Sequence, residues 1–352
     1  MFENPDYIVI GSGSAGSTIA YRLGENPSHQ VLVLEFGGSD FSPFIQMPAA
    51  LSYPMNMPKF DWGYKAEPEP ELNGRSLVCP RGRVIGGSSS INGMIYVRGN
   101  PGDYHEWARS GATGWDYPDV LPYFQRMEKS HGGTSEFRGS HGPLHVTHGK
   151  RDNPLHEAFV SAAQQAGYER TEDYNGYRQE GFGPADMTVY NGSRFSTAKA
   201  YLKPALAKKN VKLVTRALVD KIIFEGKKAV GVEFFHQGQK KIIKVKKDVI
   251  LSAGSINSPA ILQRSGIGNA DHLRNLGIEV RSHLPGVGEN LQDHLEVYFQ
   301  VKCLQPITLY KYLNPFSKLL IGMQWMFLKS GPGATNQFET LGFIRSDKNI
   351  SY

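Results

Sequence analysis

The sequence lacks the features of disulfide-rich, secreted or membrane-spanning proteins. Its 352 residues include only two cysteines, Cys79 and Cys303, which lie far apart and without the spacing of metal ligands. A disulfide framework is excluded, and a reducing compartment, hence a cytoplasmic location, is favoured. No apolar run reaches the length of about 18 residues that crosses a bilayer. Residues 1–10 also lack the basic start and long apolar stretch of a secretory signal.

What is present is typical of a large folded enzyme. Hydrophobic residues make up 40% of the chain and charged residues 20%, which excludes disordered, collagen-like and coiled-coil proteins. The net charge of +6 is spread over the whole chain, so no nucleic-acid partner is predicted. Glycine and proline, at 39 and 21 residues, exceed their usual combined share of about 12%. Many backbone positions must therefore turn tightly or lie close to another group.

The first forty residues have the pattern of a dinucleotide-binding βαβ unit. An apolar run at 6–10 ends directly in the glycine-rich turn 11–16, helix-compatible residues follow at 17–24, and a second apolar run covers 30–35. Strand, glycine turn, helix and strand thus close within about thirty residues, as this unit requires. A glycine-rich turn alone is weak evidence, but its position between two strands favours nucleotide binding over a purely structural turn.

Each glycine of the turn has a different predicted role. Gly11 permits the tight bend, Gly13 lets the backbone approach a pyrophosphate, and Gly16 lets the helix pack closely against the strand. The phosphates are expected at the helix N-terminus, where backbone N–H groups and the helix dipole favour negative charge. Glu35, 19 residues after Gly16, is predicted to accept hydrogen bonds from ribose hydroxyls, and its charge disfavours the 2′-phosphate of NADP. The unit by itself does not distinguish FAD from NAD.

Two later segments contain further glycine-rich features. Residues 79–107 are rich in glycine and serine around short apolar pieces, which suits an irregular segment that lays backbone N–H groups against an anion or a ring. Residues 247–254 are predicted to form a strand that ends at a glycine. The helix after it is predicted to have Ser258 as its N-cap and Pro259 in its first turn.

Together these segments resemble the glucose–methanol–choline (GMC) oxidoreductases, a family of FAD-dependent alcohol dehydrogenases and oxidases. The similarity is carried by residues 82–94, 254–268 and 284–294, and with the βαβ unit it extends over nearly the whole chain. The resemblance implies FAD as the cofactor. Some relatives attach the flavin through a histidine in the serine-rich segment. Here Ile91 is the nearest position and no histidine occurs at 88–94, so we predict non-covalent FAD.

The resemblance also implies which residues bind the cofactor. The ADP half is assigned to Gly11, Gly13, Ser14, Gly16 and Glu35. The pyrophosphate, ribityl chain and flavin ring are assigned to Val84, Gly87, Asn92, Gly93 and Met94. The adenine is assigned to backbone groups of Val219, and closure of the nucleotide pocket to Ala253 and Gly254.

Residues 174–184 and 336–339 are most similar to the choline-oxidising members of the family. The implied reaction is FAD-dependent oxidation of choline to betaine aldehyde for glycine betaine synthesis, with a quinone or another electron acceptor as partner. The trimethylammonium group has no N–H to donate, so its recognition requires aromatic faces and a carboxylate. The resemblance implies Trp62 and Glu339 as the substrate residues, with a packing tryptophan and a surface glutamate as the alternatives. Another primary-alcohol dehydrogenase or oxidase of the family, and a non-catalytic truncated FAD-binding protein, also stay open.

The predicted fold class is α/β. A Rossmann-like FAD-binding domain with a β-meander is expected over 1–300, with inserted loops near 130–190. Residues 301–352 are expected to begin an α+β substrate-binding domain that is truncated.

No residue of the chain is assigned a catalytic role. In this family the histidine that accepts the hydroxyl proton belongs to a later segment, which implies that the chain is an N-terminal fragment and that this histidine lies beyond Tyr352. His105 and His294 fall inside family signatures where a structural or flavin-proximal role suffices, so neither is taken as a substitute.

The β-meander is predicted between residues 211 and 249, with strands at 218–224, 229–235 and 240–246. Five lysines at 240–247 are interleaved with apolar residues. We interpret them as a solvated strand face rather than a nucleic-acid patch.

Two remaining segments could have a special role. Five of the eleven histidines lie at 131–156, but their spacing fits no compact site, so no metal is predicted. Residues 315–329 are mainly apolar between Lys318 and Lys329 and too short to span a bilayer. We interpret them as a helix buried in the substrate domain. The alternative is a helix on a membrane surface, which would allow peripheral contact with the inner face of a membrane.

Overall fold

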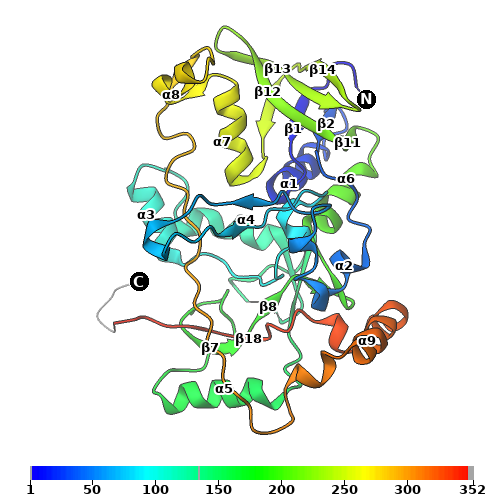
Figure 1. The fold of residues 1–352 in the computed structure, drawn as a ribbon, viewed down its shortest axis with the longest axis vertical. Helices are drawn as coiled ribbons and strands as arrows, with labels where there is room; N and C mark the ends of the chain where they lie inside the picture. Colours follow the sequence, from blue (N-terminus) through cyan, green and yellow to red (C-terminus); the bar gives the residue numbers. More distant parts are fainter. Residues whose placement is uncertain (1, 134, 348–352) are drawn as a thin grey trace. The chain divides into compact units, whose positions relative to one another are not determined.

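The computed structural model describes residues 2–133 and 135–347, and contacts divide the chain into two compact units. The first unit comprises Met1–Ser42, Ser52–Asn92 and Ser196–Phe299, and the second comprises Pro43–Leu51, Gly93–Phe195 and Gln300–Tyr352. Figure 1 shows the elements of both units along the chain. The predicted boundary at 300 is one point where the chain passes between the units. Residues 93–195, which the prediction included in the first domain, belong to the second unit.

A four-stranded parallel sheet forms the centre of the first unit. The strands are, in spatial order, β11 (Val211–Val214), β2 (Val31–Leu34), β1 (Tyr7–Ile10) and β15 (Asp248–Leu251). β1 pairs with both neighbours, so that Tyr7 lies opposite Val31 on one side and Asp248 on the other. Every residue of β2 is buried, as expected for a strand that is covered on both faces.

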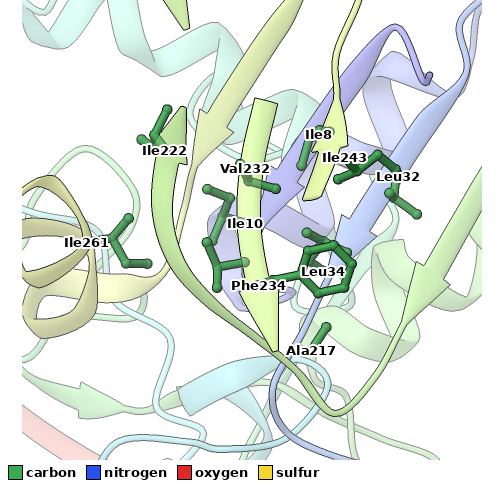
Figure 2. Packing of buried hydrophobic residues seen from close by; sticks show 11 residues of the cluster. Ile8, Ile10, Leu32, Leu34, Ala217, Ile222, Val232, Phe234, Ile243 and Ile261 are labelled. Atoms are coloured by element: carbon green, nitrogen blue, oxygen red, sulfur yellow. The ribbon is translucent and has the colours of Figure 1, made fainter. Parts of the chain in front are cut away.

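Alternate residues of the central strands pack into two separate cores. Ile8 and Ile10 of β1 pack against the meander, whereas Val9 between them packs with Ala20 of helix α1 (Ser14–Leu23). Figure 2 shows Ile8 beside Ile243 and Ile10 beside Phe234, both of the meander. Successive strand residues point to opposite faces. The unbroken apolar runs of β1 and β2 therefore fill both cores, and each buried aliphatic side chain contributes about 1.5–3 kcal/mol.

The predicted β-meander is present. β12 (Ala217–Glu225), β13 (Lys228–His236) and β14 (Gln239–Lys244) form an antiparallel sheet in that order. The turns between them contain Gly226 and Gly238, whose φ angles of 60° and 73° lie in the left-handed region that favours glycine.

Helix α7 (Gly254–Arg264) begins earlier than predicted. Its first residue is Gly254, so Ser258 is not the N-cap and Pro259 lies inside the helix. Gly254, with φ of 86°, turns the chain directly out of strand β15 into the helix. Ser258 Oγ instead accepts a hydrogen bond from Ala253 N at 3.1 Å, so this serine supports the start of the helix from within it.

The first unit is completed by short helices and strand pairs. They are η2 (Pro54–Asn56), β3 (Tyr64–Lys65), η3 (Pro70–Leu72), β4 (Val78–Cys79), η4 (Gly87–Ser90), η5 (Ala198–Leu202), α6 (Lys203–Leu206), β16 (Ile267–Gly268), α8 (Ala270–Asn275) and β17 (Ser282–His283). η5 is a π-helix and the other η elements are 3-10 helices. β3 pairs with β4, and β16 with β17.

The second unit contains small sheets and several helices. β5 (Glu128–Ser130), β6 (Leu144–His148) and β8 (Asp186–Met187) form one sheet, and β7 (Gly181–Pro184) pairs antiparallel with β18 (Thr340–Phe343). The pairing of β7 with β18 joins residues 93–195 to the last segment of the unit. The other elements are α2 (Pro43–Gln46), η1 (Pro48–Ala50), α3 (Pro101–Arg109), α4 (Tyr117–Met127), α5 (Pro154–Gln165), β9 (Val189–Tyr190), β10 (Ser193–Arg194), η6 (Leu309–Tyr312), α9 (Pro315–Leu328) and η7 (Pro332–Ala334).

Helix α9 forms where it is predicted, but the prediction that it is buried is wrong. Trp325 is its buried residue, and the indole Nε1 donates to Gly192 O at 2.7 Å. The exposed apolar residues of the helix are Phe316, Leu319, Leu320, Met323, Met326, Phe327 and Leu328. An apolar pattern leads to burial only where the fold provides a second surface, and in the described part of the unit that surface buries Trp325 and leaves Ile321 half-buried. Across residues 2–133 and 135–347, no helix is long and apolar enough to cross a membrane.

Candidate functional site

A cavity of about 750 Å³ opens in the first unit at the ends of the parallel strands, within the size range of cofactor and ligand sites. Its walls come from the turn after β1, the end of β2, the segments around residues 62–64 and 81–88, the start of β12 and the junction of β15 with α7. Eight of the predicted cofactor residues line it: Gly11, Gly13, Ser14, Glu35, Gly87, Val219, Ala253 and Gly254.

The glycine-rich turn lies so close to neighbouring backbone that two of its positions have no space for a Cβ atom. Gly11 has φ of 90°, and a Cβ there would lie 2.6 Å from Ser252 O. A Cβ on Gly16 would lie 1.9 Å from Gly11 O, which leaves no room for any side chain. Gly16 is therefore buried behind the cavity, where it lets α1 pack closely, and Gly13 lies on the cavity wall.

Two helix N-termini meet at this cavity. Gly13–Ala15 at the start of α1 and Ala253–Ser255 at the start of α7 both line it. Within the described residues, neither N-cap, Gly13 or Ala253, forms a side-chain capping hydrogen bond. The first N–H groups of both helices and the positive ends of both helix dipoles therefore favour an anion in the cavity.

Glu35 is a buried carboxylate at the end of β2. Its Oε2 accepts from Ser12 N at 2.8 Å and from Ser12 Oγ at 2.9 Å, and its Oε1 accepts from Gly37 N at 2.6 Å. Burial raises the pKa of Glu35 above its ordinary value, and these hydrogen bonds oppose the shift. A carboxylate oxygen accepts more than one hydrogen bond, so the fixed carboxylate can still receive the hydroxyls of a ribose.

Three aromatic rings form one wall of the cavity. Trp62 stacks on Phe36, with ring centroids 5.2 Å apart, and on Tyr64, with centroids 5.9 Å apart and ring planes 7° from parallel. Tyr64 Oη donates to Asn257 Oδ1 at 2.7 Å, which ties the wall to helix α7. Trp62, predicted as a substrate residue, thus lies in the same cavity as the nucleotide residues. Phe36 and Tyr64 were not predicted, although Phe36 directly follows Glu35 and could have been found from that position.

Two arginines add positive charge to the cavity wall. Arg81 pairs with Asp293, at 2.8 Å between Nη2 and Oδ2, and Arg264 pairs with Asp220, at 3.2 Å between Nε and Oδ1. These ion pairs hold the two guanidinium groups at the cavity, where they favour an anionic ligand. Arg264 lies within the similar segment 254–268, but it was not predicted as a site residue because its position at the cavity depends on the packing of α7 against β12.

The hydroxyl of Ser252, in the cavity wall, is free to form a hydrogen bond with a ligand. Ser252 Oγ is buried and has no hydrogen-bond partner among the described residues, and such groups are normally satisfied. With two helix N-termini, two arginines and an acidic residue beside an aromatic wall, the donor set fits a dinucleotide with a pyrophosphate, ribose hydroxyls and an adenine ring.

Other predicted cofactor residues lie outside this cavity. Val84 is fully buried beneath it, where a Cβ on Gly37 would lie 2.2 Å from Val84 N. Asn92 is exposed, and its backbone N–H donates to Ser88 O at 2.8 Å. Gly93 and Met94 belong to the second unit, where Met94 is fully buried with φ of 60°.

Glu339 is not the surface glutamate of the alternative interpretation. Its exposed fraction is 6%. Oε2 accepts from Arg151 N at 2.6 Å and Oε1 from Thr335 Oγ1 at 2.5 Å, while His156 Nε2 lies 3.8 Å from Oε2. Trp62 belongs to the first unit and Glu339 to the second.

The histidine-rich segment forms part of a sheet rather than one long loop. His145 and His148 lie on β6, and His131 Nε2 is 2.9 Å from His145 Nδ1. In residues 2–133 and 135–347, no group of three or more metal-ligating side chains gathers in one place.

A parallel sheet whose glycine turn and second helix start enclose one cavity defines a dinucleotide-binding α/β fold. The GMC oxidoreductase family matches residues 5–296, most of the chain, and the chain belongs to this family. The predicted fold class and family are confirmed, and the cofactor is FAD.

The chain is also similar in sequence to proteins whose names state a substrate. The oxygen-dependent choline dehydrogenase of Brucella suis is 58% identical over 347 residues, and that of Rhizobium rhizogenes is 56% identical over 345 residues. These matches cover 99% and 98% of this chain but 63% of each relative. The chain therefore spans less than two thirds of the length of these relatives.

Solved structures of several flavoproteins have the same fold. The pyridoxine 4-oxidase of Mesorbium loti is 34% identical with a TM-score of 0.77, over 80% of this chain and 56% of that one. A variant Aspergillus oryzae formate oxidase is 26% identical with a TM-score of 0.88, over 98% and 62%. An FAD-dependent oxidoreductase of Chaetomium thermophilum is 29% identical with a TM-score of 0.86, over 96% and 61%.

Proposed function

We propose that the chain is the FAD-binding part of a choline dehydrogenase, which oxidises choline to betaine aldehyde. The observation that carries the proposal is the 750 Å³ cavity, with its glycine turn, buried Glu35 and paired helix N-termini. The choice of choline is supported by the 58% identity to oxygen-dependent choline dehydrogenases over almost the whole chain.

Different residues of the cavity are proposed to bind different parts of the cofactor. The starts of α1 and α7, with Arg81 and Arg264, would neutralise the pyrophosphate. Glu35 would hold the ribose. When bound, FAD supplies the hydride acceptor for alcohol oxidation. We expect FAD to be held without a covalent bond, since residues 88–94 contain no histidine.

Trp62 is proposed to serve the cofactor rather than the choline cation. Phe36 and Tyr64 already stack on its ring, and a cation needs a ring face of its own. Glu339 remains the proposed carboxylate for choline. It is held by Arg151 N and Thr335, an arrangement that preorganises a negative charge.

The proton of the choline hydroxyl needs an acceptor, and no histidine lines the cavity within the described residues. His105 pairs with Asp116, and His294 belongs to an exposed segment. We therefore assign neither of them to proton transfer, and we expect the chain on its own to bind FAD without reducing it with choline.

Anaerobic reduction tests this proposal. The purified chain is loaded with FAD, and a complete relative serves as the positive control. We expect a yellow protein whose flavin absorbance is not bleached by choline, whereas the complete relative is bleached. Failure to retain FAD would contradict the proposed cofactor site. Bleaching of the isolated chain by choline would contradict the proposal that the chain contains no acceptor for the hydroxyl proton.

A complete relative distinguishes choline from other substrates and identifies the electron acceptor. Turnover of another primary alcohol in preference to choline would favour a different GMC dehydrogenase or oxidase. Reduction of a quinone analogue under nitrogen would support a quinone acceptor, and consumption of oxygen would support an oxidase. If the complete relative takes up FAD and oxidises no alcohol, a non-catalytic flavin-binding protein is the better description.

The Glu339 assignment is tested on the same complete relative with the equivalent Glu→Gln change. Choline should bind at least about tenfold more weakly, because a charge-assisted contact to the cation is lost. Unchanged choline affinity would refute the assignment.

We also propose that helix α9 makes a peripheral contact with an anionic membrane surface. Its apolar residues other than Trp325 and the half-buried Ile321 are exposed, and residues 297–338 contain four lysines and no acidic residue. Exposed apolar side chains beside lysines are the pattern of an interfacial helix.

Vesicle sedimentation tests the contact of α9. The chain should bind phosphatidylglycerol vesicles and release them at high salt, and Leu319→Ser with Phe327→Ser should abolish the binding. Leu295→Ser with Phe299→Ser is the matched control, because these apolar residues are even more exposed and belong to the other unit. Equal loss in both double variants would contradict a contact through α9. Concentration-dependent self-association without vesicle binding would mean that α9 covers a second copy instead.

A further inference from the structure

Two hydroxyl side chains that are far apart in sequence contact each other behind the cavity wall. Ser89 Oγ lies 2.8 Å from Thr197 Oγ1 and also accepts from Thr197 N at 3.0 Å. Ser89 is half-buried and Thr197 is buried. Neither residue lines the cavity, so the pair does not contact its occupant directly.

The pair is attached to the turn at Gly86–Gly87. Ser89 Oγ donates to Gly86 O at 2.6 Å, and Thr197 Oγ1 lies 3.4 Å from the same oxygen. The Gly86 carbonyl is therefore held by the Ser89 hydroxyl. The Ser89 hydroxyl is in turn held by the backbone N–H and the hydroxyl of Thr197. Every polar atom of this arrangement has a partner, the condition under which a buried network adds rigidity.

The turn that is held in this way is intrinsically flexible. Gly86 and Gly87 have φ angles of 85° and 53°, and consecutive glycines lose more conformational freedom on ordering than other residues do. Gly86 N also donates to Ser12 O at 2.9 Å. A Cβ on Gly87 would lie 2.7 Å from Gly13 Cα, so the turn lies against the residue that approaches the pyrophosphate.

Thr197 connects this turn to a rigid part of the core. It immediately precedes the π-helix η5, whose residues Ala198 and Leu202 are fully buried and pack with Ile85. π-helical segments are rare and are frequently found at functional sites. The contact between Ser89 and Thr197 therefore attaches the flexible glycines to η5, which restricts their movement.

We propose that Ser89 and Thr197 are positioning residues that preorganise the Gly86–Gly87 turn for the pyrophosphate of FAD. The inference rests on the proposed cofactor function and adds to it a pair of residues outside the cavity. Preorganisation strengthens binding because the ordering cost is already met in the free protein. Loss of either hydroxyl should weaken FAD binding by about five- to tenfold, the value of one net hydrogen bond.

Titration of FAD into the apo form of the full chain, followed by flavin fluorescence, tests this proposal. Thr197→Val and Ser89→Ala each remove one hydroxyl, and the double variant removes both. Thr197→Ser keeps the hydroxyl. Thr171→Val is the matched control, because Thr171 is also buried and donates one hydrogen bond, to Arg178 O at 3.2 Å, in the second unit. Thermal unfolding of each apo protein measures stability separately.

We expect the two single variants and the double variant to weaken FAD binding by similar factors, because the hydroxyls act as one unit. Thr197→Ser and Thr171→Val should bind FAD like the unchanged chain. Unchanged affinity in Thr197→Val and Ser89→Ala would overturn the proposal, as would an equal loss in Thr171→Val. If Thr197→Val does not fold, Ser89→Ala decides alone. An unchanged chain that takes up no FAD would overturn the cofactor function itself, and the positioning role with it.

Discussion

His148 Nδ1 lies 2.8 Å from Asp186 Oδ1 in the second unit, at the pairing of β6 with β8. The side chain of Asp186 is 4% exposed and that of His148 is 29% exposed. Asp186 Oδ2 also lies 2.9 Å from Arg138 Nη2 and accepts from Asn175 Nδ2 at 2.9 Å. This histidine, which the sequence placed in a loop, is thus one end of a buried polar network.

The pair makes stability depend on pH in two directions. Pairing with Asp186 raises the pKa of His148 in spite of partial burial, so its contribution is complete below about 6.5, its unfolded value, and is lost as pH rises through the folded pKa. Burial opposes ionisation of Asp186, but His148, Arg138 and Asn175 outweigh it and lower the pKa of Asp186. That contribution is lost as pH falls through the folded pKa of Asp186.

We expect the stability gained from this pair to be largest in mildly acidic solution, between the two transitions. Urea unfolding of the unchanged chain and of His148→Gln across this pH range checks the expectation. The difference between the two free energies of unfolding should shrink above neutral pH. A difference that does not vary with pH would contradict it.

Removal of Glu128 should strongly destabilise the same network. Its carboxylate is fully buried, and Oε1 lies 2.9 Å from both Arg98 Nη2 and Arg138 Nε, whose side chains are also buried. Glu128→Gln would leave the buried Arg98 without the carboxylate it pairs with, whereas Arg138 would keep Asp173 and Asp186. We expect a cost of about 3–5 kcal/mol in the free energy of unfolding. Glu25→Gln, at the exposed ion pair with Arg22, should cost less than about 1 kcal/mol. Similar urea midpoints for both variants would be inconsistent with this account.

Gly87→Ala should lose FAD binding through a backbone clash. The added Cβ would lie 2.7 Å from Gly13 Cα, at φ of 53°. Gly226→Ala is the matched control, since its φ of 60° is similar but nothing in the described chain lies within 4 Å of the added Cβ. Both variants should pay about 1–2 kcal/mol of stability for a left-handed alanine. FAD titration should show a loss of more than about tenfold for Gly87→Ala alone, and an equal loss in both would argue against the clash.

Binding of FAD should weaken as pH falls through the raised pKa of Glu35. Burial is the cause of the raised pKa, so protonation begins at a higher pH than for an ordinary glutamate. A protonated carboxyl group accepts fewer hydrogen bonds from ribose hydroxyls. Glu35→Gln should bind FAD at least about tenfold more weakly and should lose the pH dependence. If FAD affinity of the unchanged chain stays constant down to the onset of acid unfolding, Glu35 does not hold the ribose.

Trp62→Leu should affect the cofactor and not the substrate. The change removes the central ring of the wall formed with Phe36 and Tyr64, and an aromatic contact of this kind is worth about 0.5–1.5 kcal/mol. Tyr64→Phe keeps the ring and removes only the hydrogen bond to Asn257, so its FAD affinity should fall less. In a complete relative, the equivalent Trp→Leu change should weaken FAD with little effect on the KM for choline. A raised KM with normal FAD binding would restore the substrate role.

Local sequence patterns were sufficient to predict the strands and turns whose conformation depends on neighbouring residues. The strands at 7–10 and 31–34 follow from short apolar runs, and the turn at Gly11 from a φ angle that glycine adopts easily. The meander follows in the same way from its alternation and its two glycine turns. The family resemblance then placed Glu35 and Gly87 on one cavity, which periodicity could not have done.

Contacts between distant residues had to come from the tertiary structure. Trp62 lies in the nucleotide cavity because β3 pairs with β4 and because Tyr64 hydrogen-bonds Asn257, 193 residues later. Helix α9 has an apolar sequence, but burial requires a second surface, and its apolar residues other than Trp325 are largely exposed.

The residue pattern was sufficient for the class of fold and the dinucleotide turn, because these depend on φ angles and on apolar periodicity along short segments. FAD was predicted from the family resemblance instead, since the βαβ unit does not distinguish FAD from NAD. The folded structure was needed to show which side chains surround the cavity, which charges are buried together and which hydroxyl holds the Gly86 carbonyl. These depend on packing between segments that are far apart in the chain, and no short stretch of sequence contains that information.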